Sequence, residues 1–406
     1  MNPRVAIVGG VVAALLGTLF TPVRGLAQGS GHPRPDPVGL SQVPVSGWPV
    51  YVEDLTIGSP VSDYGSHFGI KASTLDDGAP ESDLFADARS LLYHATYAAN
   101  TDDGRQMDEG FFRFFDGNGA SRFAPAESRE IHFHPWGWEE TAVDGDLTAE
   151  GYAMTFEEDV FLVATIVTND GDESVTLTPR FNVRNETDPE TESSFPASQR
   201  DDFAVAEMIE PGVAGVTYAA PFVFGLFGFN VFERAIVADP EVHDVANIGS
   251  LRYYRKRVNL APFTLGPGER RGVYVLVAFD DYATPAADRA VAAQEALAAM
   301  GADAAEAIDA AVAETDAEWD DFFASLPPPH GDEPNDARIY DLAATALRMN
   351  VYGQRGLMPG RASVPGKVHF NLFFVWDLPL QALGHNEWDP TLATEELGVQ
   401  YGFCSP

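Results

Sequence analysis

Apolar and polar positions divide the chain into a strand-like part and a helical part. Between residues 48 and 282, short runs rich in β-branched and aromatic residues recur, among them 161–167, 174–181 and 272–279. Roughly ten or more such runs are typical of a large antiparallel β-sandwich. The turn-forming residues 169–171, Asn-Asp-Gly, lie between the first two of these runs and predict a hairpin.

The pattern becomes helical near residue 285. Residues 286–326 are rich in alanine and contain no proline, which predicts one long helix or two stacked helices. Within this stretch, Trp319, Phe322 and Phe323 have helical spacing and predict an apolar stripe that packs against a neighbour. Three consecutive prolines at 327–329 end the helix.

Further helices are predicted in the last part of the chain. A helix over 336–352 is indicated by apolar residues at helical spacing, namely Ile339, Leu342, Ala343, Ala346, Leu347 and Val351. A second helical run opens at 380–383. Asp389 followed by Pro390 is typical of a helix start, with a capping residue and a proline in the first turn.

The N-terminus has the pattern of a signal peptide. Arg4 precedes an apolar stretch at 5–20, and small residues at 25–27 offer a cleavage site near Ala27. An uncleaved membrane anchor is the alternative. Cleavage predicts a periplasmic or secreted protein with no further membrane association, and the Gly-, Pro- and Ser-rich residues 28–47 are then a linker.

Charge excludes some partners and indicates a habitat. The chain of 406 residues has 61 Asp and Glu against 25 Lys and Arg, a net charge of −36. A surface this acidic repels phosphate backbones, so nucleic-acid binding is not expected. Many carboxylates with few lysines favour a salt-adapted, halophilic protein over an ordinary acidic secreted one. The single cysteine, Cys404, cannot form an internal disulfide, so a sizeable core must hold the fold.

The most specific candidate for chemistry is Asp377, which follows four aromatic or apolar residues at 373–376. A carboxyl group in apolar surroundings retains its proton more tightly, as a general acid working near neutrality requires. Phe374 and Trp376 could stack against a sugar ring. The structural alternative is that Asp377 caps a helix, because Pro379 suits an early helical position.

The segments 373–384 and 387–397 resemble the first conserved block of the (α/α)6-barrel glycoside hydrolases related to family 63, a group that includes trehalases and mannosylglycerate hydrolases. The resemblance covers about 336–399. It implies an inverting, α-glycosidic hydrolase of an oligosaccharide or glycoside, with Asp377 as general acid. It also implies substrate contacts from Trp376, Phe374 and Arg361, and no metal or cofactor. His369 and Leu372 depart from the residues of trehalases, which disfavours trehalose as the substrate.

The general base of that family lies far downstream, in the second half of the barrel. The chain therefore resembles the N-terminal part of a glycosidase and is expected to be inactive alone, with the missing half truncated or separately encoded. The alternatives are a non-catalytic carbohydrate-binding or structural β-sandwich, and a polysaccharide lyase. The expected order is a signal peptide (1–27), a linker (28–47), a β-sandwich (48–282), a helical linker (283–334) and the start of an incomplete (α/α)6 barrel (335–406).

Three short motifs have weaker interpretations. His132 and His134 lie on one face of a predicted strand and could begin a metal site, although the sequence places no third ligand. The acidic segments 116–119 and 169–172 resemble parts of calcium loops. Neither has the glutamate at the twelfth position, so both are interpreted as turns.

Overall fold

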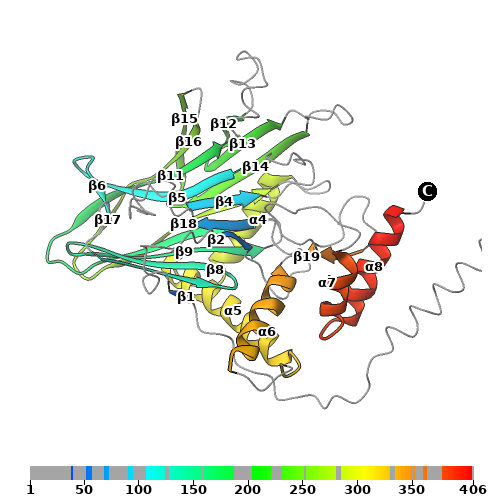
Figure 1. The fold of residues 1–406 in the computed structure, drawn as a ribbon. Helices are drawn as coiled ribbons and strands as arrows, with labels where there is room; N and C mark the ends of the chain where they lie inside the picture. Colours follow the sequence, from blue (N-terminus) through cyan, green and yellow to red (C-terminus); the bar gives the residue numbers. More distant parts are fainter. Residues whose placement is uncertain are drawn as a thin grey trace, which may run out of the picture.

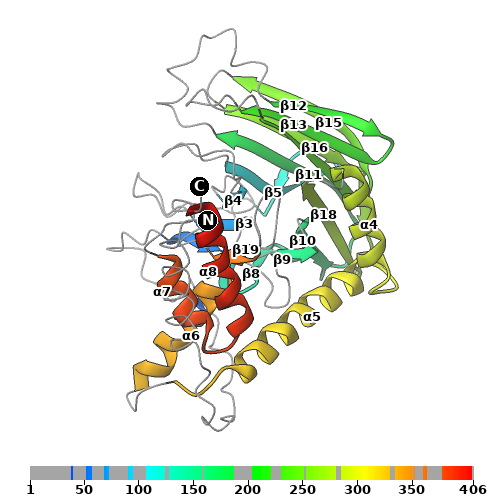
Figure 2. The ribbon, with the colours of Figure 1, turned by 90° about the vertical axis from the view of Figure 1, so that its right-hand side faces the viewer.

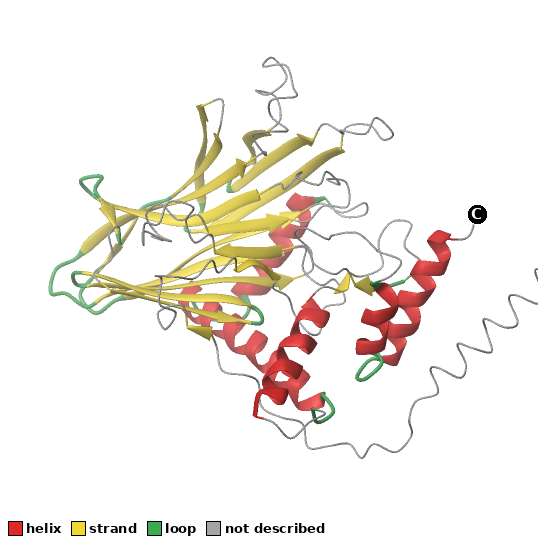
Figure 3. Cartoon of the chain, viewed as in Figure 1, coloured by secondary structure: helices red, strands yellow, loops and turns green. Residues whose placement is uncertain are grey.

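The computed structural model describes residues 38–39, 52–56, 68–72, 90–94, 107–123, 128–157, 160–186, 204–220, 230–250, 253–279, 285–329, 334–349, 351–352, 360–363 and 377–404. In these residues, two nine-stranded antiparallel sheets come first and five helices follow (Figures 1 and 3). The predicted fold class, antiparallel β-sheets followed by a helical part, is confirmed. The signal peptide lies outside the described residues, and no described helix is long and apolar enough to cross a membrane.

The first sheet, sheet A, has the strand order β1-β7-β8-β9-β10-β18-β14-β13-β12. Its strands are β1 (Val38–Gly39), β7 (Ser128–His134), β8 (Gly137–Asp144), β9 (Leu147–Glu157), β10 (Val160–Asn169), β12 (Ala204–Glu210), β13 (Val213–Ala220), β14 (Asn230–Asp239) and β18 (Arg270–Phe279). β1 falls within the segment predicted as a linker and pairs with β7.

The second sheet, sheet B, has the order β15-β16-β11-β5-β4-β3-β2, with β17 beside β11 and β6 beside β5. Its strands are β2 (Val52–Thr56), β3 (Phe68–Ala72), β4 (Ser90–His94), β5 (Met107–Asp116), β6 (Ser121–Arg122), β11 (Val175–Glu186), β15 (Val242–Ser250), β16 (Tyr253–Leu260) and β17 (Phe263–Leu265).

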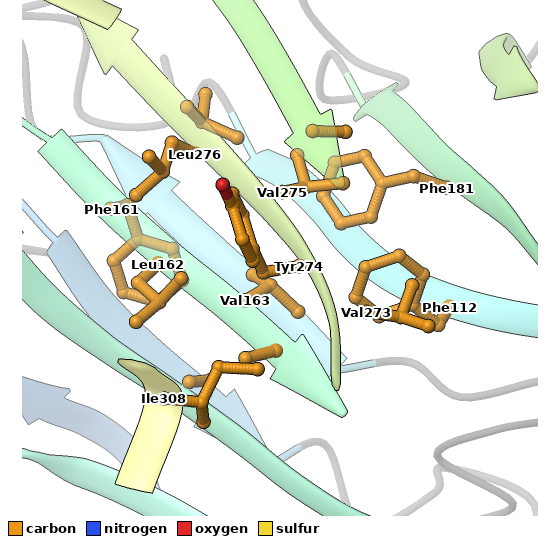
Figure 4. Packing of buried hydrophobic residues seen from close by; sticks show 14 of the residues in the cluster. Phe112, Phe161, Leu162, Val163, Phe181, Val273, Tyr274, Val275, Leu276 and Ile308 are labelled. Atoms are coloured by element: carbon orange, nitrogen blue, oxygen red, sulfur yellow. The ribbon is translucent and has the colours of Figure 1, made fainter. Parts of the chain in front are cut away.

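The centre of sheet A is covered on both faces. Strand β10 is buried along almost its whole length, which explains why its sequence is a continuous apolar run without alternation. On one face, Val273 and Val275 of β18 lie beside Phe112 and Phe181 of sheet B (Figure 4). On the other face, Gly272 lies against the backbone of the helix that begins at Ala304. The core therefore has three layers: sheet B, sheet A and helices.

The predicted hairpin at Asn169-Asp-Gly171 is wrong. The turn exists, but β10 before it belongs to sheet A and β11 after it belongs to sheet B. Asn169 is fully buried, and its side-chain amide donates to the carbonyls of Glu173 (2.8 Å) and Gly266 (3.1 Å). These bonds connect the turn to the loop before β18, so the chain crosses between the sheets instead of pairing with itself.

Two helices follow the sheets, which settles the choice between one long helix and two. They are α4 (Ala286–Ala298) and α5 (Ala304–Ser325), and Asp303 caps α5 by accepting a hydrogen bond from the backbone N–H of Glu306 (3.0 Å). Both helices contact sheet A (Figure 2). In the predicted apolar stripe, Trp319 and Phe323 are fully buried.

Three further helices form a group beyond α5: α6 (Pro334–Met349), α7 (Leu378–His385) and α8 (Pro390–Cys404) (Figures 1 and 2). A two-stranded sheet of β19 (Val351–Tyr352) and β20 (Ala362–Ser363) lies against α7 and α8. The ring of Phe322 from α5 meets Trp388, between α7 and α8, with 6.2 Å between ring centroids. That these helices begin an (α/α)6 barrel stays a prediction.

The predicted apolar face of α6 is only partly buried: Leu347 is half-buried, Val351 is buried in β19 beyond the helix end, and the side chain of Leu342 lies outside the described ones. Ile339 is 64% exposed, and Ala343 and Ala346 are exposed as well. The residues that the helix buries in the described part are Asp341, Ala344 and Arg348, spaced for one face. The helix thus turns polar side chains inward, toward a group of buried polar residues on α7 and α8.

Candidate functional site

Asp377 stands at the start of α7 and is half-buried. Its backbone carbonyl accepts hydrogen bonds from the N–H groups of Leu380 (3.0 Å) and Gln381 (2.9 Å). Its side chain makes no capping hydrogen bond, and its backbone is already helical, with φ −87° and ψ −41°. The structural alternative, a capping role for the carboxylate, is therefore not observed.

Arg361 lies just before β20 and binds two carboxylates at the start of α8. Its Nε donates to Oε2 of Glu395 (2.8 Å) and its Nη2 to Oε1 of the same residue (3.3 Å). Its Nη1 donates to Oδ2 of Asp389 (3.4 Å), and its backbone N–H donates to Glu395 (3.0 Å). Two parallel bonds to one carboxylate fix the plane of the guanidinium.

Of the predicted site residues, the structure places Asp377 and Arg361. Trp376 and Phe374 lie outside the described residues. Asp377 is not among the partners of Arg361 in the described part of the chain. What the fold does bring together is Arg361 with Glu395 and Asp389, an arrangement that connects the β20 segment to α8.

A second polar group, which the sequence did not indicate, lies beside this arrangement. Ser363 of β20, His385 of α7 and Glu396 of α8 are all fully buried. Oε1 of Glu396 accepts hydrogen bonds from both the backbone N–H (2.9 Å) and the hydroxyl of Ser363. Nε2 of His385 is 3.5 Å from the same oxygen. One carboxyl group thus joins three elements, and we call these residues the buried triplet.

Burial shifts the pKa values of Glu396 and His385 in opposite directions. Burial raises the pKa of Glu396 to about 7, although the hydrogen bonds from Ser363 act against the rise. Burial, together with the positive charges of Arg348 and Arg361, lowers the pKa of His385 to about 3.

The helical spacing of apolar residues in α7 and α8 could have drawn attention to His385 and Glu396. Glu396 continues the buried face of α8 formed by Leu392, Ala393 and Val399, where an apolar residue is expected. His385 likewise falls on the buried face of α7. A polar residue on an apolar face is a reason to look for a partner, but the pattern does not say which one.

Among the weaker motifs, His134 and the segment 116–119 have structural explanations, whereas the side chain of His132 lies outside the described ones. His134 stacks on Trp136 with 4.4 Å between ring centroids, and its Nε2 lies 3.1 Å from Glu139. No group of three or more His, Cys, Asp or Glu among the described residues could hold a metal ion. Asp116 accepts hydrogen bonds from the N–H groups of Asn118 and Ala120, both at 2.9 Å, so this segment is a turn, as interpreted.

Comparison with known proteins gives distant structural similarity alone. No family model matches the chain, and no curated protein matches it. Among 86 similar solved chains, a putative kojibiose phosphorylase from the human microbiome covers 82% of this chain at 8% identity and a TM-score of 0.39. A polysaccharide lyase covers 48% at 16% identity and a TM-score of 0.26. The chain spans 45% and 29% of their respective lengths.

These two names belong to carbohydrate-active enzymes, and the resemblance to them is distant. At such identities and TM-scores it carries no argument about the activity of this chain. The relation to family 63 suggested by residues 373–397 therefore stays a prediction.

Proposed function

We propose that this chain is part of a glycoside hydrolase that inverts an α-glycosidic linkage, with Asp377 as the general acid. The observation that supports the proposal is the state of the Asp377 side chain. It stands half-buried at a helix start and takes no part in capping that helix. The segment around it resembles, in sequence, the first conserved block of the inverting glycosidases related to family 63.

In the proposed reaction, Asp377 protonates the leaving glycosidic oxygen while a second carboxylate activates water on the opposite face of the sugar. Inverting enzymes place the two carboxyl groups roughly 6.5–9.5 Å apart, which leaves room for the water. Trp376 and Phe374 are proposed to stack against the sugar. Arg361 is proposed as a polar contact whose orientation is fixed by Glu395 and Asp389. This mechanism requires no metal or organic cofactor.

The second carboxylate is not assigned to a residue of this chain. The proposal places it on further helical sequence, either in the same protein or in a separately encoded C-terminal half. The chain alone is then expected to bind a carbohydrate without hydrolysing it. The proposal also includes export, with cleavage near Ala27, and adaptation to high salt.

The test measures hydrolysis of a panel of α-linked disaccharides in high salt. It uses the full chain, alone and co-expressed with any separately encoded half, and follows the anomeric form of the product by NMR. Asp377→Asn is expected to lower kcat about 100-fold or more, since general acids contribute about 10²–10⁴-fold. Asp303→Asn is the matched control, because it makes the same change at the start of α5 and retains a capping side chain.

Two results would contradict the proposal. Undiminished hydrolysis by Asp377→Asn would remove this residue from the chemistry. A product that retains the anomeric configuration would exclude the inverting mechanism. Glycan binding without hydrolysis in every combination would favour the alternative, a non-catalytic carbohydrate-binding protein.

A further inference from the structure

Glu396 is the only polar side chain on a face of α8 that otherwise buries Leu392, Ala393 and Val399 in the described part of the helix. It meets Ser363 and His385, which lie on β20 and α7. We propose that Glu396 and His385 form a one-proton pair, in which a protonated carboxyl and a neutral imidazole hold α7 and α8 against β20. This inference does not depend on the proposed enzymatic function.

Geometry and burial lead to this inference. The side chains of both residues are fully buried, and 3.5 Å separates Nε2 of His385 from Oε1 of Glu396. Oε2 of Glu396 and both ring nitrogens of His385 have no hydrogen-bond partner in the described part of the chain. A buried charge without full hydrogen bonding is strongly destabilising. One proton on the carboxyl group leaves neither residue charged.

The charged neighbours come from every element that packs around the pair. From α6, Arg348 and Asp341 are both buried. From the β20 side, Arg361 acts on both members, because its positive charge lowers the pKa of each. From the start of α8, Asp389 raises the pKa of Glu396.

The charge of Arg361 is partly offset by other residues, and the carboxyl group of Glu396 is held by hydrogen bonds. Arg361 forms ion pairs with Asp389 and Glu395. These carboxylates offset much of its positive charge and so weaken its effect on Glu396 and His385. The two interactions of Glu396 with Ser363 are made to Oε1, and they hold the carboxyl group in place in either protonation state. Desolvation is the first cause of both pKa shifts.

The sign of the pH dependence follows from the two shifts. The raised pKa of Glu396, from 4.5 to about 7, stabilises the fold fully below pH 4.5, and this contribution is lost as the pH rises to 7. The lowered pKa of His385, from 6.5 to about 3, stabilises the fold above pH 6.5, and this contribution is lost as the pH falls to 3. Between pH 4.5 and 6.5 the two contributions to the free energy of unfolding change with pH in opposite directions and cancel.

In that interval, the folded and unfolded chains bind the same number of protons. The unfolded chain carries its proton on His385, and the folded chain carries it on Glu396. Folding moves the proton from one residue to the other, so the packing of α7, α8 and β20 does not depend on pH there. If either residue is replaced, the stability should depend on pH, because the contribution of the other residue is no longer cancelled.

The test is hydrogen exchange of the α7 and α8 backbone amides in the full chain between pH 4.5 and 6.5, corrected for intrinsic exchange. Wild-type protection is expected to stay level. Protection in Glu396→Gln should rise about tenfold per pH unit, and protection in His385→Gln should fall about tenfold per unit, because one proton is then unbalanced. Glu387→Gln, which removes an exposed carboxylate between α7 and α8, is the control and should stay level.

A second measurement keeps the inference testable if a variant fails to fold. In the wild-type protein, the NMR signals of the His385 imidazole should remain those of the neutral ring from pH 6.5 to 4.5. Titration of this ring near pH 6.5 would overturn the inference. Equal slopes in Glu396→Gln and wild type would overturn it as well.

Discussion

The three-layer core makes a sharp prediction at Gly272, where β18 passes beneath the first turn of α5. A Cβ atom added at this position would lie 2.5 Å from the carbonyl carbon of Ala304 and 2.5 Å from the nitrogen of Ala305. Both are backbone atoms, so no side chain can turn away. Ordinary contact begins at 3.4 Å, so helix and strand must separate by about 1 Å.

Gly272→Ala should therefore destabilise the fold. Overpacking of this kind costs about 1–3 kcal/mol, and replacing a strand glycine with alanine returns about 0.5–1 kcal/mol of backbone entropy. The difference is a net loss of about 0–2.5 kcal/mol, with a midpoint of about 1.2 kcal/mol. The measurement is urea unfolding followed by circular dichroism, in which the midpoint should fall while the slope stays constant.

Gly398→Ala is the matched control, because it adds the same methyl group on α8 where nothing lies within 4 Å. It should stabilise α8 by about 0.5–1 kcal/mol, the difference in helix propensity. If Gly272→Ala were as stable as the wild type while Gly398→Ala gained stability, α5 could not rest on β18 as closely as described.

Two more substitutions test the contacts of the helices. Asp316→Ala should cost about 1–3 kcal/mol in urea unfolding, because the indole N–H of buried Trp136 loses its acceptor at 2.7 Å. Asp316→Asn keeps an acceptor and should lose much less; an equal loss would contradict the argument. Asp389→Ala removes the cap that accepts from the N–H of Leu392 (3.0 Å) and a partner of Arg361. It should lower stability by about 1–2 kcal/mol, whereas a variant as stable as the wild type would show that the cap is dispensable.

Part of the candidate site was accessible from the sequence, and part was not. The sequence indicated Asp377 at the start of a helix, and the structure places it there. It also indicated Arg361, but nothing in the local sequence shows that Glu395 and Asp389 bind this residue across about thirty positions. Glu396 was overlooked because a glutamate in an acidic chain looks like one more surface carboxylate.

Local interactions explain what the sequence determined by itself. Alanine-rich composition, capping residues and prolines act within a few positions, so they predicted the helices at 286–326 and the starts of the two last helices. β-branched and aromatic runs predicted the strands for the same reason. The order of sheets and then helices followed directly from where these patterns change.

Tertiary structure decided which surfaces meet, because burial depends on segments far apart in the chain. It sent β10 and β11 to different sheets although a good turn joins them. It exposed Ile339 of α6 and buried Asp341 and Arg348 instead. It also placed His385 beside Glu396, where the loss of water shifts the pKa values of both residues. Desolvation is a property of the packed state: a helical pattern marks which face is buried, but not which residues meet there.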